Sequence, residues 1–164
     1  MVSASDIEAL VWERLALIPD PEIPVISILE LGVVRNVRYD GKLLELDITP
    51  TYTGCPAMQL FVAEIKAAMH DQGLDQVKIN TVYSPAWTTD WLTAEAKEKL
   101  RRYGIAPPVK NADSGDPFAE PPLVPCPRCD SDHTRLVSQF GATACKSLYT
   151  CQDCKEPFEY FKHF

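Results

Sequence analysis

Two Cys-x-x-Cys pairs near the C-terminal end constrain the fold of this chain more than any other feature. The first pair is Cys126 and Cys129, the second is Cys151 and Cys154, and 21 residues separate them. Two residues between cysteines let both thiolates face into one tight turn, and two such turns supply four sulfurs to a tetrahedral ion. The spacing therefore predicts a structural zinc site. An iron–sulfur cluster or a single iron ion is the alternative, because four thiolates suit those groups too.

The residues around these pairs predict a zinc ribbon over 125–164. Short strand patterns occur over 134–140, 147–150 and 158–164. A module of about 40 residues rarely stays folded without a metal or disulfides. The ion would therefore be needed for folding even if it had no other role. His133 and His163 are candidate substitute ligands, because histidine also binds zinc, but the four cysteines already complete a tetrahedral site.

Cys145 is a further cysteine of the ribbon, in a turn between the two pairs. One interpretation is a small buried apolar residue. The other is an exchangeable ligand for iron or an iron–sulfur cluster, with a thiol that Lys146 makes more acidic. The sequence leaves both open.

The residues before the ribbon predict the element order α-β-β-α-β-α. A capping box at Ser5–Glu8 starts the first helix, which stops at Pro19, and Asp40-Gly41 signals a two-residue hairpin turn. The step from the second strand through a helix to the third is long enough for a parallel crossover. We therefore predict an α+β fold, a small mixed three-stranded sheet with helices on one face, followed by the β zinc ribbon. The expected strands are 33–39, 44–48 and 77–83, and the later helices span about 56–73 and 93–103.

The composition changes between these two parts of the chain. Residues 106–124 are rich in proline and acidic side chains and show little periodicity, which is typical of an extended linker. We therefore expect three segments: a domain over 1–105, the linker over 106–124, and the ribbon over 125–164.

Cys55 is the single cysteine of the first domain and lies between Gly54 and Pro56, at the start of a helix. A helix N-terminus favours the thiolate through its dipole and its free N–H groups, and the Thr51 and Thr53 hydroxyls are near in sequence. The alternative is a core cysteine at an element boundary. No histidine stands nearby, so a papain-like dyad lacks support and we expect no catalytic activity of the chain's own.

Asp20 and Glu22 flank Pro21 in a stiff turn. They are either solvated turn acids, with Asp20 capping the turn, or carboxylates near Cys55 that orient a metal or a partner. A mixed set of thiolate and carboxylate suits transient iron binding better than a permanent zinc site. Trp87 and Trp91 are an aromatic pair that is either core or interaction surface.

Composition excludes several classes of function. Hydrophobic residues make up 46% of the chain, but no run of about 18 apolar residues predicts a membrane span. The N-terminus lacks the features of a secretory signal, so we expect a cytoplasmic protein. The net charge is −7 and no segment is basic, which argues against nucleic-acid binding and favours protein partners.

Three stretches of the first domain, 20–25, 31–34 and 49–56, resemble the metal–sulfur cluster biosynthesis family that includes SufT. The ribbon stretches 140–149 and 156–162, with 85–91, are similar to members that carry a ribbon and belong to phenylacetate degradation. The resemblance implies that Cys55 is the functional thiol and that Asp20 and Glu22 lie in a signature turn. Cys145 matches a family cysteine, whereas His163 stands where such proteins often have cysteine.

The resemblance also implies a function. The chain would be a maturation factor for the iron–sulfur or di-iron centres of phenylacetyl-CoA epoxidase, a multicomponent monooxygenase. Its partners would be the reductase or oxygenase component and the iron–sulfur assembly machinery, and a homodimer is an open alternative for its oligomeric state. The competing hypothesis is a permanent structural component of the same complex that transfers no metal.

Overall fold

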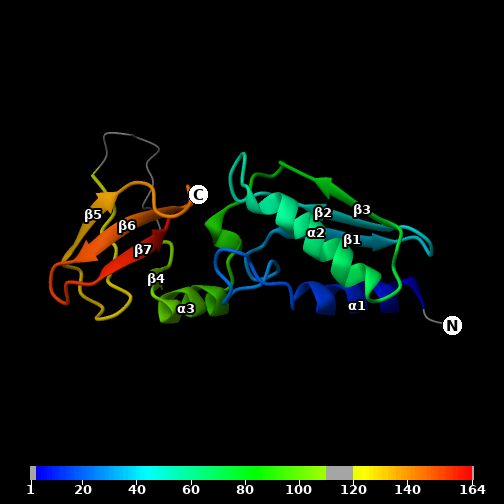
Figure 1. Ribbon diagram of the computed structural model, residues 1–164, viewed down its shortest axis with the longest axis horizontal. Coiled ribbons are helices and arrows are strands. Elements are labelled where there is room, and N and C mark those ends of the chain that lie inside the picture. The colour runs from blue at the N-terminus through cyan, green and yellow to red at the C-terminus, as the bar shows by residue number, and fades with distance from the viewer. Residues whose placement is uncertain (1–2, 110–119, 164) are drawn as a thin grey trace. The chain divides into compact units, whose positions relative to one another are not determined.

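The computed structural model describes residues 3–109 and 120–163 (Figure 1). The chain divides into two compact units, Met1–Trp87 and Thr88–Phe164. Among the described residues, no helix is both long and apolar enough to traverse a bilayer. The first unit contains α1 (Ala4–Leu15), β1 (Val34–Tyr39), β2 (Leu44–Ile48), α2 (Ala57–His70) and β3 (Val77–Thr81). The second contains η1 (Thr89–Trp91), α3 (Ala94–Tyr103), β4 (Ile105–Ala106), β5 (Thr134–Ser138), β6 (Lys146–Cys151) and β7 (Pro157–Phe161).

The sheet of the first unit confirms the predicted topology. Its strand order is β1-β2-β3, with β1 antiparallel and β3 parallel to the central strand. Leu44, Leu46 and Ile48 alternate along β2 and are fully buried, because α1 and α2 pack over the sheet. The intervening Glu45 and Asp47 point the other way and pair with charged residues of the neighbouring strands. The period-two pattern of this strand therefore set which face became the core.

Two local predictions in this unit are wrong. The N-cap of α1 is Ser3 rather than Ser5, because the Ser3 side chain accepts from the Asp6 N–H and Asp6 reaches back to the Ser3 N–H. The β1–β2 connection is a four-residue loop, since the last paired residues are Tyr39 and Leu44. Asp40 Oδ1 accepts from the N–H groups of Lys42 at 2.9 Å and Leu43 at 2.7 Å, so the aspartate side chain caps this loop.

The second unit is built on a four-stranded sheet in the order β4-β7-β6-β5. The short strand β4, which the sequence analysis did not predict, runs parallel to β7. The core below it is aromatic, with Tyr149, Phe158 and Tyr160 buried next to Ala106 and Val124. The ribbon is therefore completed by β4 and by residues at the two ends of the expected linker, Ala106 and Val124.

The observed division of the chain differs from the expected segments. Helix α3 lies in the second unit, although its residues were expected in a domain ending at residue 105, and the unpredicted β4 spans the expected end of that domain. Both flanks of the expected linker are attached to the ribbon. The Val109 N–H donates to the Tyr160 hydroxyl at 3.4 Å, and the Tyr149 hydroxyl donates to the Pro122 carbonyl at 3.2 Å. Residues 110–119, the middle of that expected linker, lie outside the described residues.

A four-sulfur centre and a separate thiol site

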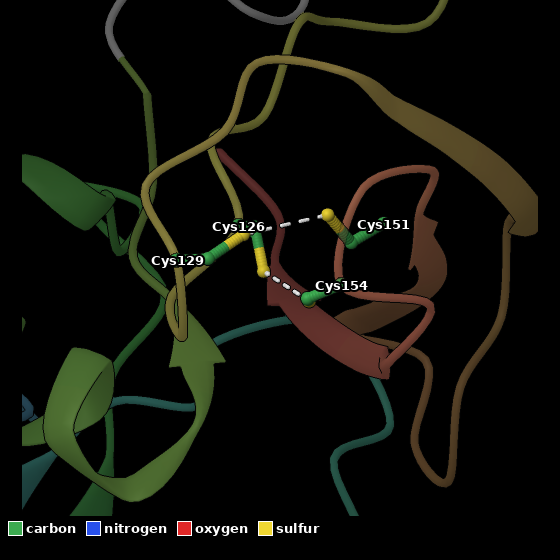
Figure 2. A group of neighbouring side chains, drawn as sticks. All are labelled: Cys126, Cys129, Cys151 and Cys154. Carbon is green, nitrogen blue, oxygen red and sulfur yellow. Dashed lines mark hydrogen bonds between the residues drawn. The ribbon is translucent and has the colours of Figure 1, made fainter.

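The four predicted ligands converge on one point in the second unit. The sulfur atoms of Cys126, Cys129, Cys151 and Cys154 all lie within 4.8 Å of one another. Figure 2 shows the side chains of the two Cys-x-x-Cys pairs pointing toward one another. The Sγ–Sγ distance is 3.8 Å for Cys126–Cys154 and 3.6 Å for Cys129–Cys151. A tetrahedral zinc ion with bonds of about 2.3 Å separates its sulfurs by about 3.8 Å. The donor set therefore fits a tetrathiolate metal ion.

Both turns are built in the same way. The residue after each second cysteine has a left-handed backbone, with φ of 58° at Asp130 and 67° at Lys155. This conformation folds the chain back, so that the N–H of Ser131 points to the Cys129 sulfur and that of Glu156 to the Cys154 sulfur. N–H donors of this kind favour the charged thiolate that a metal needs. Neither position could be predicted from the sequence, because glycine is the usual signal for a left-handed residue.

Charge in this centre is uneven. Burial raises the pKa of the Cys151 thiol, but the backbone N–H groups of Cys154 and Asp153 and the neighbouring thiols outweigh burial and bring this pKa down to about 6.

The shifts at two neighbours of Cys151 are opposite in sign. The Ser131 N–H lowers the pKa of Cys129, but burial and the neighbouring thiols raise this pKa to about 12. The pKa of Cys154 is also raised, although the Glu156 N–H lowers it. Without a metal, one thiolate at Cys151 is therefore shared with protonated neighbours, and a divalent cation would replace their protons.

The two histidines that the sequence analysis weighed are not in the described four-cysteine group. His133 instead takes part in a surface contact between the two turns: its Nδ1 lies 3.4 Å from Asp153 Oδ1, and the Ser131 hydroxyl donates to the other oxygen of Asp153. His163 follows β7, whose strand ends at Phe161.

Cys145 lies apart from the metal centre. It directly precedes β6, whereas Cys151 ends that strand, and six residues of strand span about 20 Å. The Cys145 side chain is buried, with its sulfur 3.0 Å from the Thr143 hydroxyl. The ammonium group of Lys146 lies 2.7 Å from Glu159 Oε2, so its charge is directed at that carboxylate. A role for Cys145 in iron binding stays a prediction.

Cys55 occupies the predicted position in the first unit. It lies two residues before the first residue of α2, and its side chain is half-buried. The Thr51 hydroxyl lies 4.0 Å from the sulfur, at the outer limit for a hydrogen bond to sulfur. The carboxylates of Asp20 and Glu22 both act electrostatically on this thiol.

These surroundings raise the pKa of the Cys55 thiol above its ordinary value. Burial is the largest cause; the Ala57 N–H and the Thr51 hydroxyl lower the pKa, and the negative charges of Asp20 and Glu22 raise it. The expectation that the helix start would favour the thiolate is wrong in its net direction, because desolvation outweighs the helix N–H groups.

The acidic turn confirms the capping interpretation for Asp20, whereas a role in orienting a metal or a partner stays a prediction. This side chain is buried, and its Oδ1 accepts from the backbone N–H groups of Glu22 at 2.8 Å and Ile23 at 2.7 Å. It therefore caps its own turn while its charge reaches Cys55. Trp87 is core, since it is buried and its indole N–H donates to the Leu31 carbonyl at 2.9 Å. Trp91 is only partly buried and ends η1.

Comparison with known proteins agrees with this two-part organisation. Residues 8–81 match the family described as iron-sulfur cluster assembly protein, and residues 110–162 match the family described as PaaD zinc beta ribbon domain. A protein of Escherichia coli K12, provisionally named as the D component of 1,2-phenylacetyl-CoA epoxidase, is 50% identical over 93% of this chain and 90% of its own length.

Two further relatives match about half of this chain. The Fe-S protein maturation auxiliary factor YitW of Bacillus subtilis is 38% identical over 49% of the chain and 80% of its own length. The factor SufT of Staphylococcus aureus is 31% identical over 51% of the chain and 97% of its own length. The crystal structure of a DUF59 domain from Bacillus anthracis superposes with a TM-score of 0.55 at 25% identity, over 59% of this chain and 93% of that domain.

Proposed function

The chain belongs to the family of the 1,2-phenylacetyl-CoA epoxidase D component, and on this premise we propose that it is an accessory factor that matures the iron centres of that epoxidase. Its first unit is related to Fe-S protein maturation auxiliary factors, and its second unit belongs with the PaaD zinc ribbons. The client is the reductase or the oxygenase component of the enzyme, and the iron is supplied by the iron–sulfur assembly machinery in the cytoplasm.

The observation that carries this proposal is the composition of the Cys55 site. A half-buried thiol, with the charges of Asp20 and Glu22 acting on it, offers sulfur and oxygen donors together. Ferrous iron accepts both donor types, whereas stable zinc sites in small modules favour four thiolates or imidazoles. The site therefore suits iron held as cargo rather than as a resident cofactor.

The raised pKa of Cys55 makes this binding transient. The thiol is protonated at neutral pH, so an incoming ferrous ion displaces the proton as the sulfur–iron bond forms. The reverse step, protonation of the sulfur, helps release the iron to a client. A thiol with a depressed pKa would bind the ion more tightly and hand it over less readily.

In the second unit, we infer that the four cysteines hold zinc and that this ion is structural. Cys126, Cys129, Cys151 and Cys154 would provide all of its ligands, and the ion supplies folding energy to a ribbon with a small core. The remaining surface of the ribbon is then available to dock the client.

A strain that lacks this chain tests the proposal. The oxygenase and reductase components are purified from it, and their iron and acid-labile sulfide are measured against those from the parent strain. We expect depleted metal in at least one component, restored by the wild-type chain and not by Cys55→Ser. Full occupancy in the deletion strain would end the proposal.

The second candidate is a permanent structural component of the complex, and the observation that favours it is the 50% identity to a protein named as part of the epoxidase itself. A structural component co-purifies at fixed stoichiometry with the oxygenase, as a monomer or as a homodimer. If Cys55→Ser leaves the assembly intact but inactivates newly made epoxidase, the maturation role is favoured over this alternative.

A further inference from the structure

Ser131 and Asp153 belong to different turns of the four-sulfur centre, and their side chains bind each other. Ser131 follows Cys129 by two residues in the first turn, and Asp153 lies between Cys151 and Cys154 in the second. The Ser131 hydroxyl donates to a carboxylate oxygen of Asp153. We call these two residues the Ser131–Asp153 pair. Neither residue is a metal ligand, yet their bond joins the two turns that carry the ligands.

Each residue of the pair also binds a ligand sulfur through its backbone. The Ser131 N–H donates to the Cys129 sulfur, and the Asp153 N–H donates to the Cys151 sulfur. These two sulfurs come from different turns and lie 3.6 Å apart. The hydrogen bonds therefore form a closed path that joins one ligand of the first turn to one ligand of the second without passing through the metal.

Neighbouring bonds keep the Ser131–Asp153 pair in place. The Ser131 hydroxyl accepts from the His133 N–H at 3.0 Å, which leaves its own proton directed at Asp153. The Gln152 N–H donates to the His133 carbonyl at 2.7 Å, so a backbone bond links the same two segments of the chain. The His133 ring adds a longer contact, with Nδ1 at 3.4 Å from Asp153 Oδ1.

The carboxylate of Asp153 is unfavourable beside a loaded metal centre. A divalent ion with four thiolates has a net charge of about −2, which repels a nearby negative group. The Asp153 side chain is 57% exposed, so water weakens this repulsion, and the positive charge of Lys155 acts on the same carboxylate. A charged acceptor also forms a stronger hydrogen bond than a neutral one. The bond to Ser131 therefore explains an acidic residue at this position better than any attraction to the metal does.

The four ligands differ in their access to solvent. One cysteine of each turn is exposed, Cys129 in the first and Cys154 in the second, and the other two are buried. A chelator or a competing thiol reaches an exposed ligand first, and it removes the ion only if that ligand moves away. Movement of Cys129 also displaces Ser131, which is bound to Asp153. Loss of the metal through this exposed ligand therefore breaks the Ser131–Asp153 pair.

We propose that Ser131 and Asp153 are positioning residues that hold ligand sulfurs of the two turns together and slow the loss of metal to competing ligands. The inference rests on the proposed structural zinc. It deepens that proposal, because it assigns the retention of the ion to two residues that do not coordinate it. Residues that orient metal ligands in this way commonly affect metal affinity strongly.

The test measures zinc release from the zinc-loaded full chain. The chromogenic chelator pyridylazoresorcinol is added in excess at neutral pH, and the release rate is measured at several chelator concentrations. The variants are Ser131→Ala, Asp153→Asn and the double substitution, and Ser131→Thr is the conservative variant that keeps the hydroxyl. Asp132→Asn is the matched control, since it removes the same charge from the same segment and the described residues form no hydrogen bond or ion pair with the Asp132 side chain.

Each variant is first checked for an intact ligand set. Zinc per chain should equal that of wild type, and the cobalt-substituted protein should absorb as a tetrahedral tetrathiolate site. Ser131→Ala removes neither a charge nor a ligand, so faster release from this variant does not arise from altered electrostatics. Asp153→Asn is the milder substitution and carries the comparison if Ser131→Ala does not fold.

We expect Ser131→Ala to release zinc about five- to tenfold faster than wild type. Asp153→Asn should give a smaller increase, because its amide oxygen still accepts from Ser131. The double substitution should be no faster than Ser131→Ala, since both side chains act through one bond. Ser131→Thr and Asp132→Asn should stay within about twofold of wild type. The increase should lie in the part of the rate that grows with chelator concentration.

Three outcomes would overturn the inference while leaving the zinc site in place. The first is an equal release rate for wild type, Ser131→Ala and Asp153→Asn at every chelator concentration. The second is an increase confined to the rate extrapolated to zero chelator, which would assign the pair to folding stability alone. The third is a double substitution whose effect is the product of the two single effects. A wild-type chain that retains no zinc would instead remove the proposed structural zinc together with this inference.

Discussion

The Cys55 site and the four-sulfur centre both contain cysteine sulfur, but the two sites surround it differently. Around Cys55, burial and two carboxylates keep a single sulfur protonated. In the ribbon, backbone N–H groups and neighbouring thiols bring the pKa of Cys151 down to about 6, and three more sulfurs lie within bonding range of one ion. Under the proposed function, these different surroundings would let the ribbon retain a metal and let Cys55 exchange one.

The two units should differ most in their response to removal of the metal. Loss of a structural zinc removes on the order of 10 kcal/mol of folding free energy, so chelation at neutral pH should unfold the ribbon. Helix α3 should lose its order too, because Arg101 pairs with Asp130 of the first turn and β4 pairs with β7. Amide hydrogen exchange should show lost protection over 94–106 and 134–161, and retained protection over α2 and β2.

Cys126→Ser should reproduce this pattern without chelator, whereas Cys145→Ser should keep its metal, since Cys145 lies outside the four-sulfur group. If both units lose protection together when the metal is removed, the separation of the two sites would be refuted.

Cys55→Ser should leave both units folded and impair function. The side chain is half-buried and makes one long contact with Thr51, so the change in unfolding free energy should be below about 1 kcal/mol. Epoxidase activity in a complemented deletion strain should nevertheless fall at least tenfold. The control is Thr53→Ser, an exposed neighbour in the same loop. Wild-type activity with Cys55→Ser would show that this thiol is not the working group.

Charge neutralisation near Cys55 should move its reactivity in a known direction. Glu22→Gln removes a negative charge that raises the pKa, so iodoacetamide should react faster near pH 8. Thr51→Val removes a hydrogen bond that lowers the pKa, so the same reaction should slow. In wild type, the rate should still be climbing above pH 9, because the folded pKa is above the ordinary value. Equal rates for all three proteins would contradict the assigned electrostatics.

The smallest effect should come from a left-handed position in the second turn. Lys155→Gly relieves the conformational strain of a non-glycine residue with φ of 67°, which should raise the stability of the metal-loaded ribbon by about 1 kcal/mol. Loss of the contact between the Lys155 ammonium and the Gln152 carbonyl reduces this gain. Thermal unfolding measures it, with Gln152→Gly, which relieves no such strain, expected to destabilise. A lower melting temperature for Lys155→Gly would mean that the lysine contact dominates.

The features that were predictable from the sequence are those set by local patterns. Alternation in β2 indicated the core face, and the Cys-x-x-Cys spacing indicated the four sulfurs. The features that were missed depend on contacts between distant residues. Strand β4 exists because β7 supplies its partner, and the pKa of Cys55 depends in part on carboxylates more than 30 residues earlier. The Ser3 cap was missed because two serines competed for one helix start.

The metal content of protein prepared without oxygen tests the central contrast most directly. Wild type and Cys55→Ser are each incubated with ferrous iron, freed of loosely bound metal and analysed for zinc and iron. We expect one tightly held zinc per chain in both proteins, and additional iron only in wild type. Equal iron in the two proteins, or loss of zinc in Cys55→Ser, would contradict this expectation.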